Sequence, residues 1–258
     1  MLNKEILHKA IEAMEEIQEE KRVPKNLVKV KFESGLTLSY FSDLPEIKEG
    51  DVVTVDGKME DEIAVVVKVL SSFKKPKFDM KWIVSKIDND LTGNYFKVED
   101  DVVSFDLNLT VDKFMNIYAG VKYKENIAVG EDDVELDLNE LEESELFEEE
   151  IKHRGRLLYK NNAVQFIWLK DGIGKAAVRS ANGCDFYEID FRYKNEKITY
   201  IACDCPYFEA CKHTYALLLK LKDFKKKVLD KYQSDNFVMC RKGCFNYMML
   251  YGKGRVSI

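Results

Sequence analysis

Eleven residues, Cys203 to His213, put three cysteines and one histidine into the pattern C-x-C-x5-C-x-H. Three thiolates and one imidazole are the complete ligand set of a closed, tetrahedral structural zinc site. In a strand, Cys203 and Cys205 point to the same face and can share one ion. Cys211 and His213 stand where a helical pattern begins, and a helix N-terminus and the Lys212 cation both favour a thiolate. We therefore expect one structural Zn²⁺, with Cys203, Cys205, Cys211 and His213 as its ligands.

The alternative is a cluster of reduced core cysteines beside an unrelated histidine. Residues 1–20 predict an amphipathic helix rich in glutamate and not a signal peptide. Without a secretory signal, the six cysteines are expected to be reduced and to bind metal rather than to form disulfides. No stretch approaches the roughly 18 apolar residues of a membrane span. We expect a cytoplasmic protein that does not enter a membrane.

The cysteine window and its flanks resemble the SWIM zinc finger, a ββα module with the motif C-x-C, a variable spacer and C-x-H. Residues 154–159, Arg-Gly-Arg-Leu-Leu-Tyr, match the arginine-glycine-aromatic opening of this family. Residues 211–217, Cys-Lys-His-Thr-Tyr-Ala-Leu, are close to its C-K-H-x-x-A-L ending. The resemblance covers residues 154–220 and implies the same four ligands, in a module that binds DNA, RNA or protein. It departs from the family at residues 182–185, where members often have a glycine-serine turn, and it leaves Cys184 without a role.

The net charge of −6 conceals an uneven distribution along the chain. Residues 1–150 carry 19 Lys+Arg and 36 Asp+Glu, whereas residues 151–258 carry 21 and 10. The sign reverses abruptly where residues 152–156 read Lys-His-Arg-Gly-Arg. A chain of 258 residues is expected to form two domains of ordinary size. We place an acidic α+β domain at 1–150 and a basic zinc-binding domain at 151–258.

The acidic run from Glu131 to Glu150, which holds twelve acidic residues, has two interpretations. Blocks of like charge often form tails, linkers or solvated helix faces. Apolar residues interrupt this run, so that part of it should fold; they are Val134, Leu136, Leu138, Leu141, Leu146 and Phe147. The run is either a solvated acidic face on a short helix or a segment that covers the basic half when no partner is present.

Short strands joined by tight turns dominate the N-terminal domain. The strand signals lie at residues 27–32, 36–41, 52–55, 63–70 and 81–87, with Gly-containing turns between several of them. Such a series is typical of a small β-barrel. A later helix is expected over residues 111–118, with Thr110 as its N-cap and Asp112 in its first turn. The predicted fold class is α+β, with a barrel-like N-terminal domain and flanking helices.

The C-terminal domain is expected to be a sheet closed by a helix. Residues 163–169 and 175–179 form a hairpin, and residues 197–202 pair back on the preceding strand and lead to the cysteines. Between them, residues 187–193 alternate apolar and charged side chains, which predicts one buried and one wet face. In the helix after His213, the core positions recur at helical spacing; they are Leu217, Leu221, Phe224 and Val228.

Lysines fill the other side of this last helix. They face either solvent alone or the phosphates of a nucleic acid, and the arginines near residue 155 favour the latter. Lysine and arginine contacts of that kind are salt-sensitive and tolerant of sequence. The candidate nucleic-acid-binding residues are Arg154, Arg156, Lys220, Lys225, Lys226 and Lys227.

Cys240 and Cys244 form a second pair, spaced C-x3-C. One interpretation is half of a second metal site together with Cys184. The favoured one is a hairpin turn between a strand at residues 237–240 and a strand at residues 244–250.

No catalytic signature accompanies the zinc motif. The chain has no G-x-x-x-x-G-K-[ST], G-x-S-x-G or H-E-x-x-H sequence. A zinc ion with four protein ligands has no open position for water and cannot act as a Lewis acid. We expect no enzymatic activity and no small-molecule substrate, and instead a module that binds nucleic acid. The alternatives are a protein-binding module and a regulatory subunit of a DNA-processing complex.

Overall fold

The computed structural model of the chain divides into two compact units, Met1–Lys86 and Ile87–Ile258. It describes residues 22–60, 62–74, 76, 78–119, 134–183, 185–195, 197–207, 210–229, 234 and 236–258. The helix predicted over residues 1–20 lies outside these ranges. The domain boundary expected at 150/151 falls inside the second unit. Strands from residues 87–150 pair with strands from residues 151–258 in one sheet, and a helix from residues 87–150 packs on that sheet.

The first unit is a five-stranded antiparallel sheet with strand order β2-β1-β4-β3-β5. Its strands are β1 (Asn26–Phe32), β2 (Thr37–Ser42), β3 (Val52–Val55), β4 (Ile63–Leu70) and β5 (Ile83–Lys86). The first four lie within one residue of the predicted positions, and β5 begins two residues later and ends one residue earlier than predicted. The edge strand β2 meets the start of β5 at one isolated bridge, Phe41↔Trp82. The described strands therefore form a curled sheet and not the closed barrel that was expected.

Alternation along these strands builds the core of the first unit. In β1, Val28, Val30 and Phe32 are buried, whereas the lysines between them are exposed. Side chains from all five strands complete this core, with Val53, Ile83 and others packed on the same face. The period-2 pattern of the sequence thus decides which face of the sheet is covered.

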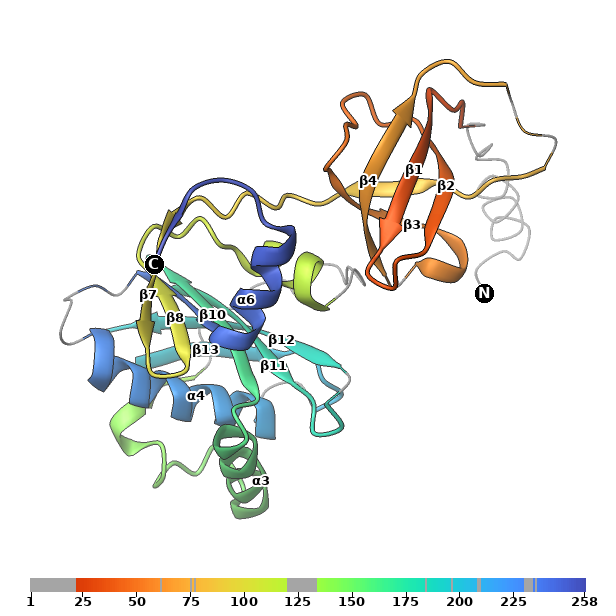
Figure 1. Cartoon of the computed structure of the whole chain (residues 1–258). Helices are drawn as coiled ribbons and strands as arrows, with labels where there is room; N and C mark the ends of the chain where they lie inside the picture. The colour runs from red at the N-terminus through yellow and green to blue at the C-terminus, as the bar shows by residue number, and fades with distance from the viewer. Residues whose placement is uncertain are drawn as a thin grey trace, which may run out of the picture. The chain divides into compact units, whose positions relative to one another are not determined.

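An antiparallel sheet of eight strands forms the second unit (Figure 1). Its order is β7-β8-β14-β10-β11-β12-β13-β9. The strands are β7 (Phe96–Val98), β8 (Asp101–Ser104), β9 (Leu136–Asp137), β10 (Val164–Lys170), β11 (Ile173–Arg179), β12 (Phe186–Lys194), β13 (Lys197–Cys203) and β14 (Phe237–Arg241). Two further short strands, β6 (Gly93–Asn94) and β15 (Val256–Ser257), pair in parallel with each other and form a separate two-stranded ribbon.

Helices cover both faces of this sheet. They are α2 (Val111–Phe114), α3 (Glu149–Lys160), α4 (Lys212–Phe224) and α6 (Lys242–Tyr251). On one face Phe224 of α4 stacks on Phe237 of β14, with ring centroids 4.8 Å apart. On the other face Phe114 of α2 stacks on Phe166 of β10 at 4.9 Å. The second unit is therefore a three-layered α+β domain, with α3 and α4 on one side and α2 and α6 on the other (Figure 1).

The expected hairpins and helix starts are largely confirmed. Strands β10 and β11 are joined by Asp171-Gly172, both with positive φ, and β12 and β13 pair as predicted. Thr110 caps α2 by accepting a hydrogen bond from the Lys113 N–H at 3.3 Å. The four predicted core positions of α4 and its extension are all buried.

Two expectations about this unit were wrong. Residues 242–251 form helix α6 and not the second strand of a hairpin, because Cys244, Phe245 and Met248 bury one helical face; short apolar runs do not distinguish the two structures. The charged face of β12 is not simply wet, since α2 lies on that side of the sheet. Asp190 is 6% exposed and pairs with Lys175 at 2.9 Å.

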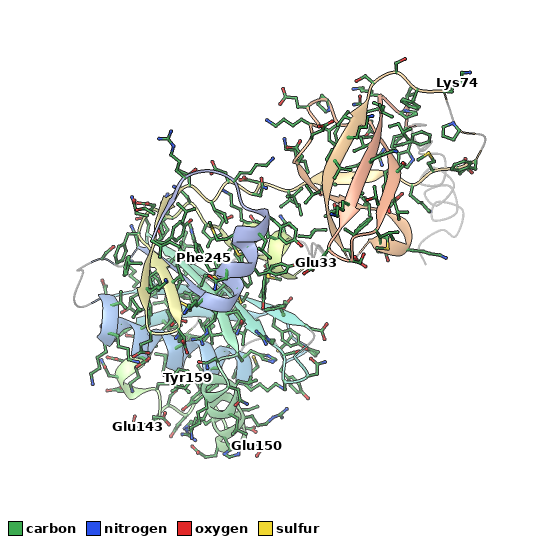
Figure 2. All side chains as sticks on the ribbon, viewed as in Figure 1. Glu33, Lys74, Glu143, Glu150, Tyr159 and Phe245 are labelled. Atoms are coloured by element: carbon green, nitrogen blue, oxygen red, sulfur yellow. The ribbon has the colours of Figure 1, made fainter. Side chains whose placement is uncertain are left out.

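The described part of the acidic run is an integral piece of the second unit. Leu136 in β9 and Leu138 and Leu141 after it are buried in the main core, together with Phe147. Strand β9 pairs with β13, and Glu148 precedes the first turn of α3. Figure 2 shows Glu143 and Glu150 at the outer surface of this unit. Acidic side chains face solvent while the apolar ones between them anchor the segment, so that it is not a detachable cover.

Charge is nearly balanced once the boundary is placed at residue 87. Residues 87–150 carry 4 Lys+Arg and 20 Asp+Glu, and they fold together with the basic residues 151–258. The whole second unit carries 25 Lys+Arg and 30 Asp+Glu. The sharp division of charge in the sequence is therefore largely a complementarity within one folded unit.

The anchoring of the acidic segment is testable with one core truncation. Leu141→Ala should lower the free energy of unfolding of the second unit by about 2–5 kcal/mol, the usual cost of removing a buried leucine side chain. Trp168 is the tryptophan of this unit, so its fluorescence in a Trp82→Phe background follows the unfolding in denaturant. The exposed Glu145→Ala in the same segment is the matched control and should have little effect. Equal stability of the two variants would restore the interpretation of a detachable cover.

Candidate metal centre

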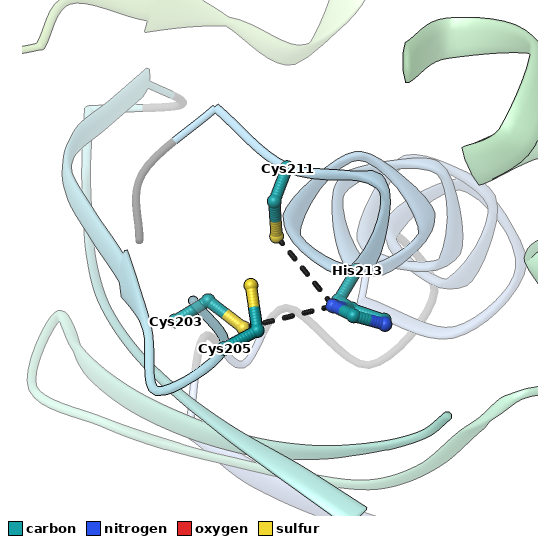
Figure 3. A group of neighbouring side chains, drawn as sticks. All are labelled: Cys203, Cys205, Cys211 and His213. Atoms are coloured by element: carbon teal, nitrogen blue, oxygen red, sulfur yellow. Dashed lines mark hydrogen bonds between the residues drawn. The ribbon is translucent and has the colours of Figure 1, made fainter. Parts of the chain in front are cut away.

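The four cysteine and histidine side chains meet at the junction of β13 and α4. Cys203 is the last residue of β13, and Cys205 follows in the turn after it. Cys211 is the N-cap of α4, and His213 is the second residue of that helix. Figure 3 shows the three sulfur atoms and the imidazole directed to one point. The C-x-C spacing predicted a strand that continues to Cys205, whereas β13 ends at Cys203. Both cysteines nevertheless reach the same site.

The distances within this cluster fit a tetrahedral metal ion. All four ligand atoms lie within 4.8 Å of one another. His213 Nδ1 is 3.9 Å from Cys203 Sγ and 3.7 Å from Cys211 Sγ. Zn–S bonds of about 2.3 Å and a Zn–N bond of about 2.0 Å at tetrahedral angles place S and N about 3.5 Å apart. A zinc ion would therefore need only small side-chain movements to be bound.

Hydrogen bonds at the start of α4 hold Cys211 in place. The Thr214 N–H donates to Cys211 Sγ at 3.4 Å, and Cys211 N–H donates to Thr214 Oγ1 at 3.0 Å. This reciprocal pair is a capping box with a thiol in place of the usual hydroxyl. It aims the sulfur back over the first turn of the helix, where the helix dipole favours a negative ligand.

Strand β12 supports the turn that carries Cys205. The Glu188 N–H donates to Asp204 Oδ1 at 3.0 Å, and the Asp204 N–H donates to the Glu188 carbonyl at 3.0 Å. Burial next to Asp204 raises the pKa of the Glu188 carboxyl above its ordinary value. The two hydrogen bonds extend the β12–β13 ladder past Cys203 and fix the path of the chain to the second ligand.

The imidazole of His213 is oriented by packing. It lies against the Tyr187 ring, with centroids 4.3 Å apart and an angle of 32° between the planes. Its Nε2 atom is buried and has no hydrogen-bond partner among the described residues. Nδ1 faces the sulfur atoms, so the geometry assigns Nδ1 as the ligand atom.

Electrostatics divide the three thiols into two classes. Hydrogen bonds to Cys203, His213 and the Thr214 N–H lower the pKa of the Cys211 thiol to about 3. The hydrogen bond to Cys211, together with burial, raises the pKa of Cys203. Burial likewise raises the pKa of Cys205. A metal-free cluster therefore holds one thiolate, at Cys211, and two neutral thiols that share its charge.

The cluster is closed to solvent. All four side chains are buried, with exposed fractions of 3% or less. Three sulfur ligands and one nitrogen ligand from protein fill a tetrahedral coordination sphere without water. The arrangement is suited to a structural ion and not to one that activates a substrate.

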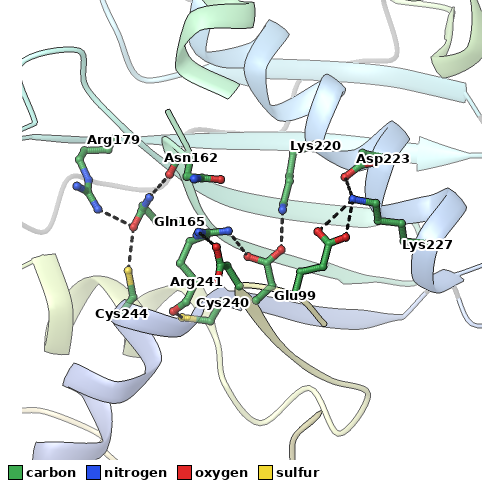
Figure 4. Close-up of polar contacts among 12 residues, drawn as sticks. Glu99, Asn162, Gln165, Arg179, Lys220, Asp223, Lys227, Cys240, Arg241 and Cys244 are labelled. Atoms are coloured by element: carbon green, nitrogen blue, oxygen red, sulfur yellow. Dashed lines mark hydrogen bonds and ion pairs between the residues drawn. The ribbon is translucent and has the colours of Figure 1, made fainter. Parts of the chain in front are cut away.

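Two of the predicted nucleic-acid-binding residues, Lys220 and Lys227, form ion pairs within the unit (Figure 4). Lys220 pairs with Asp101 at 2.6 Å, and both side chains are largely buried. Lys227 pairs with Glu99 at 3.1 Å and with Asp223 at 3.0 Å. These carboxylates hold the lysines against the protein, which makes them poor candidates for contact with an external phosphate.

The other four predicted residues differ among themselves. Arg156 pairs with Glu142 and lies over the Tyr215 ring, whereas Lys225 is half-buried and engaged by neighbouring groups. Arg154 and Lys226 are exposed, and no described carboxylate pairs with either. Within the described part of the chain, the predicted basic surface is thus reduced to two cations without a carboxylate partner, Arg154 and Lys226.

Cys240 and Cys244 do not join a metal cluster among the described residues. Both are buried, and Cys244 Sγ donates a hydrogen bond to Gln165 Oε1 at 2.9 Å (Figure 4). Burial raises the pKa of Cys240, while the hydrogen bond to Cys240 lowers the pKa of Cys244. They pack α6 onto the sheet. Cys184, the third member of the alternative site, lies outside the described residues.

Sequence patterns missed the groups that support the ligands. Thr214, Tyr187 and Asp204 position the cluster through the contacts above. Only Thr214 had a local signal, since it stands three residues after the N-cap in the position of a capping-box residue. The other two depend on the pairing of β12 with β13 and cannot be read from the spacing of the cysteines.

Comparison with known proteins identifies no relative. No protein-family model, curated protein or solved structure matches the chain. Within the described residues, no helix is long and apolar enough to cross a membrane. The function must therefore be argued from the cluster and from the charges that surround it.

The division of the thiols predicts how zinc affinity changes with pH. Two neutral thiols must lose their protons to bind the ion, whereas Cys211 already is a thiolate. Binding near pH 7.5 should release about two protons, so that the affinity rises with pH as the raised pKa values are approached. Calorimetry in two buffers of different ionisation enthalpy measures the number released. Release of three protons would show that Cys211 is a neutral thiol in the metal-free protein, as it would be in an unfolded chain, and release of none would show that all three thiols are already ionised; either result would contradict the division of the thiols.

Proposed function

We propose that Cys203, Cys205, Cys211 and His213 bind one structural Zn²⁺ and that the surrounding ββα element is a zinc finger of the SWIM type. The observation that carries this proposal is the convergence of four buried ligand atoms within 4.8 Å of one another. The donor set itself is the one that structural zinc sites use. The C-x-C-x5-C-x-H spacing supports the assignment to the SWIM type.

Zinc in this position would tie three elements together. Its ligands come from the end of β13, from the turn after it and from the first turn of α4. Structural zinc contributes roughly 10–16 kcal/mol of folding free energy in finger peptides at neutral pH. A domain is typically stable by only about 5–15 kcal/mol. Folding of the second unit is therefore expected to depend on the ion.

The role that follows for the protein is binding and not catalysis. A zinc ion with four protein ligands offers no coordination position to a substrate. We propose a cytoplasmic, non-enzymatic module that contacts the phosphates of DNA or RNA through exposed cations that pair with no described carboxylate, such as Arg154 and Lys226. Phosphate contacts of this kind require cations at the surface and no particular base sequence.

A second candidate function is protein binding, alone or within a DNA-processing complex. The near balance of charge in the second unit and the internal pairing of Lys220 and Lys227 both favour it. Large apolar side chains are also exposed on this unit, among them Leu157 at 48% and Leu250 at 73%. Single exposed apolar residues are ordinary, however, and do not define an interface.

The zinc assignment predicts a fixed stoichiometry and a folding defect. The purified protein should contain one zinc per chain by native mass spectrometry. Cys205→Ser should lose the ion and unfold the second unit, because the remaining ligands leave the coordination sphere incomplete. Trp168 fluorescence then reports the loss of structure, whereas Trp82 in the first unit should keep its native signal.

Cys240→Ala is the matched control for this experiment. It removes a buried cysteine that lies outside the cluster, so the variant should retain one zinc. A wild-type protein that folds fully without metal would contradict the structural role. Two zinc ions per chain would instead show that Cys240 and Cys244 belong to a metal site.

Nucleic-acid binding should depend on free cations more than on paired ones. The full chain should bind a short oligonucleotide at ~50 mM salt and weaken steeply as salt rises. Lys226→Gln should weaken binding without changing thermal stability, because this side chain is exposed. Lys220→Gln should instead lower thermal stability, because it removes a partner of the buried Asp101 carboxylate.

Fluorescence anisotropy and thermal unfolding together separate these two effects. A wild-type chain that binds neither DNA nor RNA at this salt concentration would rule out the nucleic-acid function. Protein binding would then be the better supported role.

A further inference from the structure

Cys240 and Cys244 are two buried thiols that the proposed zinc site does not use. Cys240 lies in β14, where the preceding residue Met239 belongs to the core beneath α4, so that Cys240 points to the opposite face of the sheet. Cys244 is the third residue of α6, the helix on that face, and it is buried there. The two thiols hydrogen bond to each other. A strand and a helix thus bring two sulfur atoms into contact in a closed space.

The surroundings of Cys244 stabilise a thiolate. Its Sγ donates to Gln165 Oε1 at 2.9 Å, and the Arg179 Nη2 donates to the same oxygen at 2.7 Å (Figure 4). The guanidinium and the sulfur therefore lie within the roughly 4–6 Å over which an opposite charge favours an ionised group. The Tyr118 hydroxyl donates a further hydrogen bond to this sulfur. The start of the 10-residue helix α6 adds a favourable dipole.

Cys240 has the opposite environment. Burial raises the pKa of its thiol, and the contact with Cys244 and the Asp101 carboxylate raise it further. The hydrogen bond from Cys240 is in turn the largest of the effects that lower the pKa of Cys244. One thiol of the pair is therefore the more easily ionised, while its neighbour stays protonated.

Packing alone does not account for this asymmetry. Buried thiols in apolar surroundings are unreactive, whereas a nearby cation and a helix N-terminus are features of reactive cysteines. Within the described ranges, no imidazole or carboxylate joins Cys240 and Cys244 in a metal cluster. A reactive thiol that touches a second, protonated thiol is instead equipped to form a disulfide.

We propose that Cys240 and Cys244 form a site of oxidative modification, at which a hydroperoxide converts the two thiols into a disulfide. Cys244 is the nucleophile, and Cys240 is the resolving thiol. The pair requires neither the zinc ion nor a nucleic acid. A disulfide here would tie the first turn of α6 to the end of β14 and remove the thiol that donates to Gln165.

With hydrogen peroxide the reaction balances in two steps. Cys244 loses its proton and attacks one peroxide oxygen: an S–O bond forms, the O–O bond breaks, and the leaving hydroxide takes up a proton to become water. Cys240 then attacks the sulfur of the resulting sulfenic acid: the S–S bond forms, the S–O bond breaks, and the hydroxide leaves with the Cys240 proton as a second water. The two sulfur atoms lose two electrons, and the peroxide gains them.

The burial of both sulfur atoms limits the oxidant to a small molecule. The exposed fractions are 1% for Cys240 and 2% for Cys244. Hydrogen peroxide is neutral and close to water in size, whereas glutathione disulfide is a charged peptide that the packed start of α6 excludes. We therefore expect peroxide to oxidise the pair and glutathione disulfide to leave both thiols unmodified.

The test treats the zinc-loaded full chain with a slight molar excess of hydrogen peroxide and maps its tryptic peptides by mass spectrometry. Trypsin cleaves after Arg241 and Lys242, which separates the two cysteines into different peptides. The oxidised chain should give a peptide that ends at Arg241 joined to one that begins at Gly243, and a reductant should separate them. Zinc content and thermal midpoint are measured in the same samples.

Single variants test the role of each thiol. Cys240→Ser should trap a sulfenic acid on Cys244, which dimedone labels, because the resolving thiol is missing. Cys244→Ser should leave Cys240 unlabelled. Arg179→Gln should slow formation of the disulfide at least about threefold at neutral pH, because a smaller fraction of Cys244 is then a thiolate. Lys170→Gln removes an exposed cation from the same sheet and is the matched control, which should react like the wild type.

The outcomes decide between a reactive pair and two packing residues. A linked peptide that forms while the zinc content is unchanged would support the modification site. Peptides that stay separate in the wild type, or oxidation of the zinc ligands before any link forms, would overturn it. Dimedone on Cys240 in the Cys244→Ser variant would contradict the assigned nucleophile, and a glutathione adduct on either thiol would contradict the restriction to a small oxidant.

Discussion

The convergence of four metal-ligand side chains at the junction of β13 and α4 is the constraint on which the second unit depends. The ligands come from a strand end, a turn and a helix N-terminus, which ordinary packing would join only weakly. Three thiols packed against an imidazole form a poor core by themselves, since one of them is already a thiolate. A bound divalent cation would convert this concentration of buried charge and polarity into a rigid link. Helix α4 then carries the core that covers one face of the sheet.

Charge complementarity within the second unit is the other organising feature. The acidic residues 87–150 and the basic residues 151–258 fold together, and individual pairs such as Asp101 with Lys220 are largely buried. A division of charge in sequence is therefore not evidence of a charged partner. Binding of an anionic partner depends instead on the cations that pair with no carboxylate of the described residues. Among the residues that the structure describes, Arg154 and Lys226 are such cations.

Local structure and the metal ligands could be predicted from the sequence because their signals are local. Runs of β-branched and apolar residues bounded by turn residues located β1 to β4, and a ligand spacing with few alternatives located the cluster. The Thr110 cap of α2 also has a purely local cause. These features depend on neighbours within a few residues, and the structure confirms the strand positions and the meeting of the four side chains.

Long-range pairing was beyond the reach of the sequence patterns. The boundary at residue 87 follows from β7 and β8 joining the sheet through β14, some 140 residues later in the chain. Helix α6 was mistaken for a strand because its apolar run is short and fits both periods.

X-ray absorption at the zinc edge of the purified full chain tests the central claim most directly. The account predicts a four-coordinate zinc with three sulfur neighbours at about 2.3 Å and one nitrogen neighbour at about 2.0–2.1 Å. The same spectrum should lack an oxygen neighbour from bound water. A coordination shell of nitrogen and oxygen alone, or fewer than three sulfur neighbours, would contradict the Cys203, Cys205, Cys211 and His213 site on which the proposed function is built.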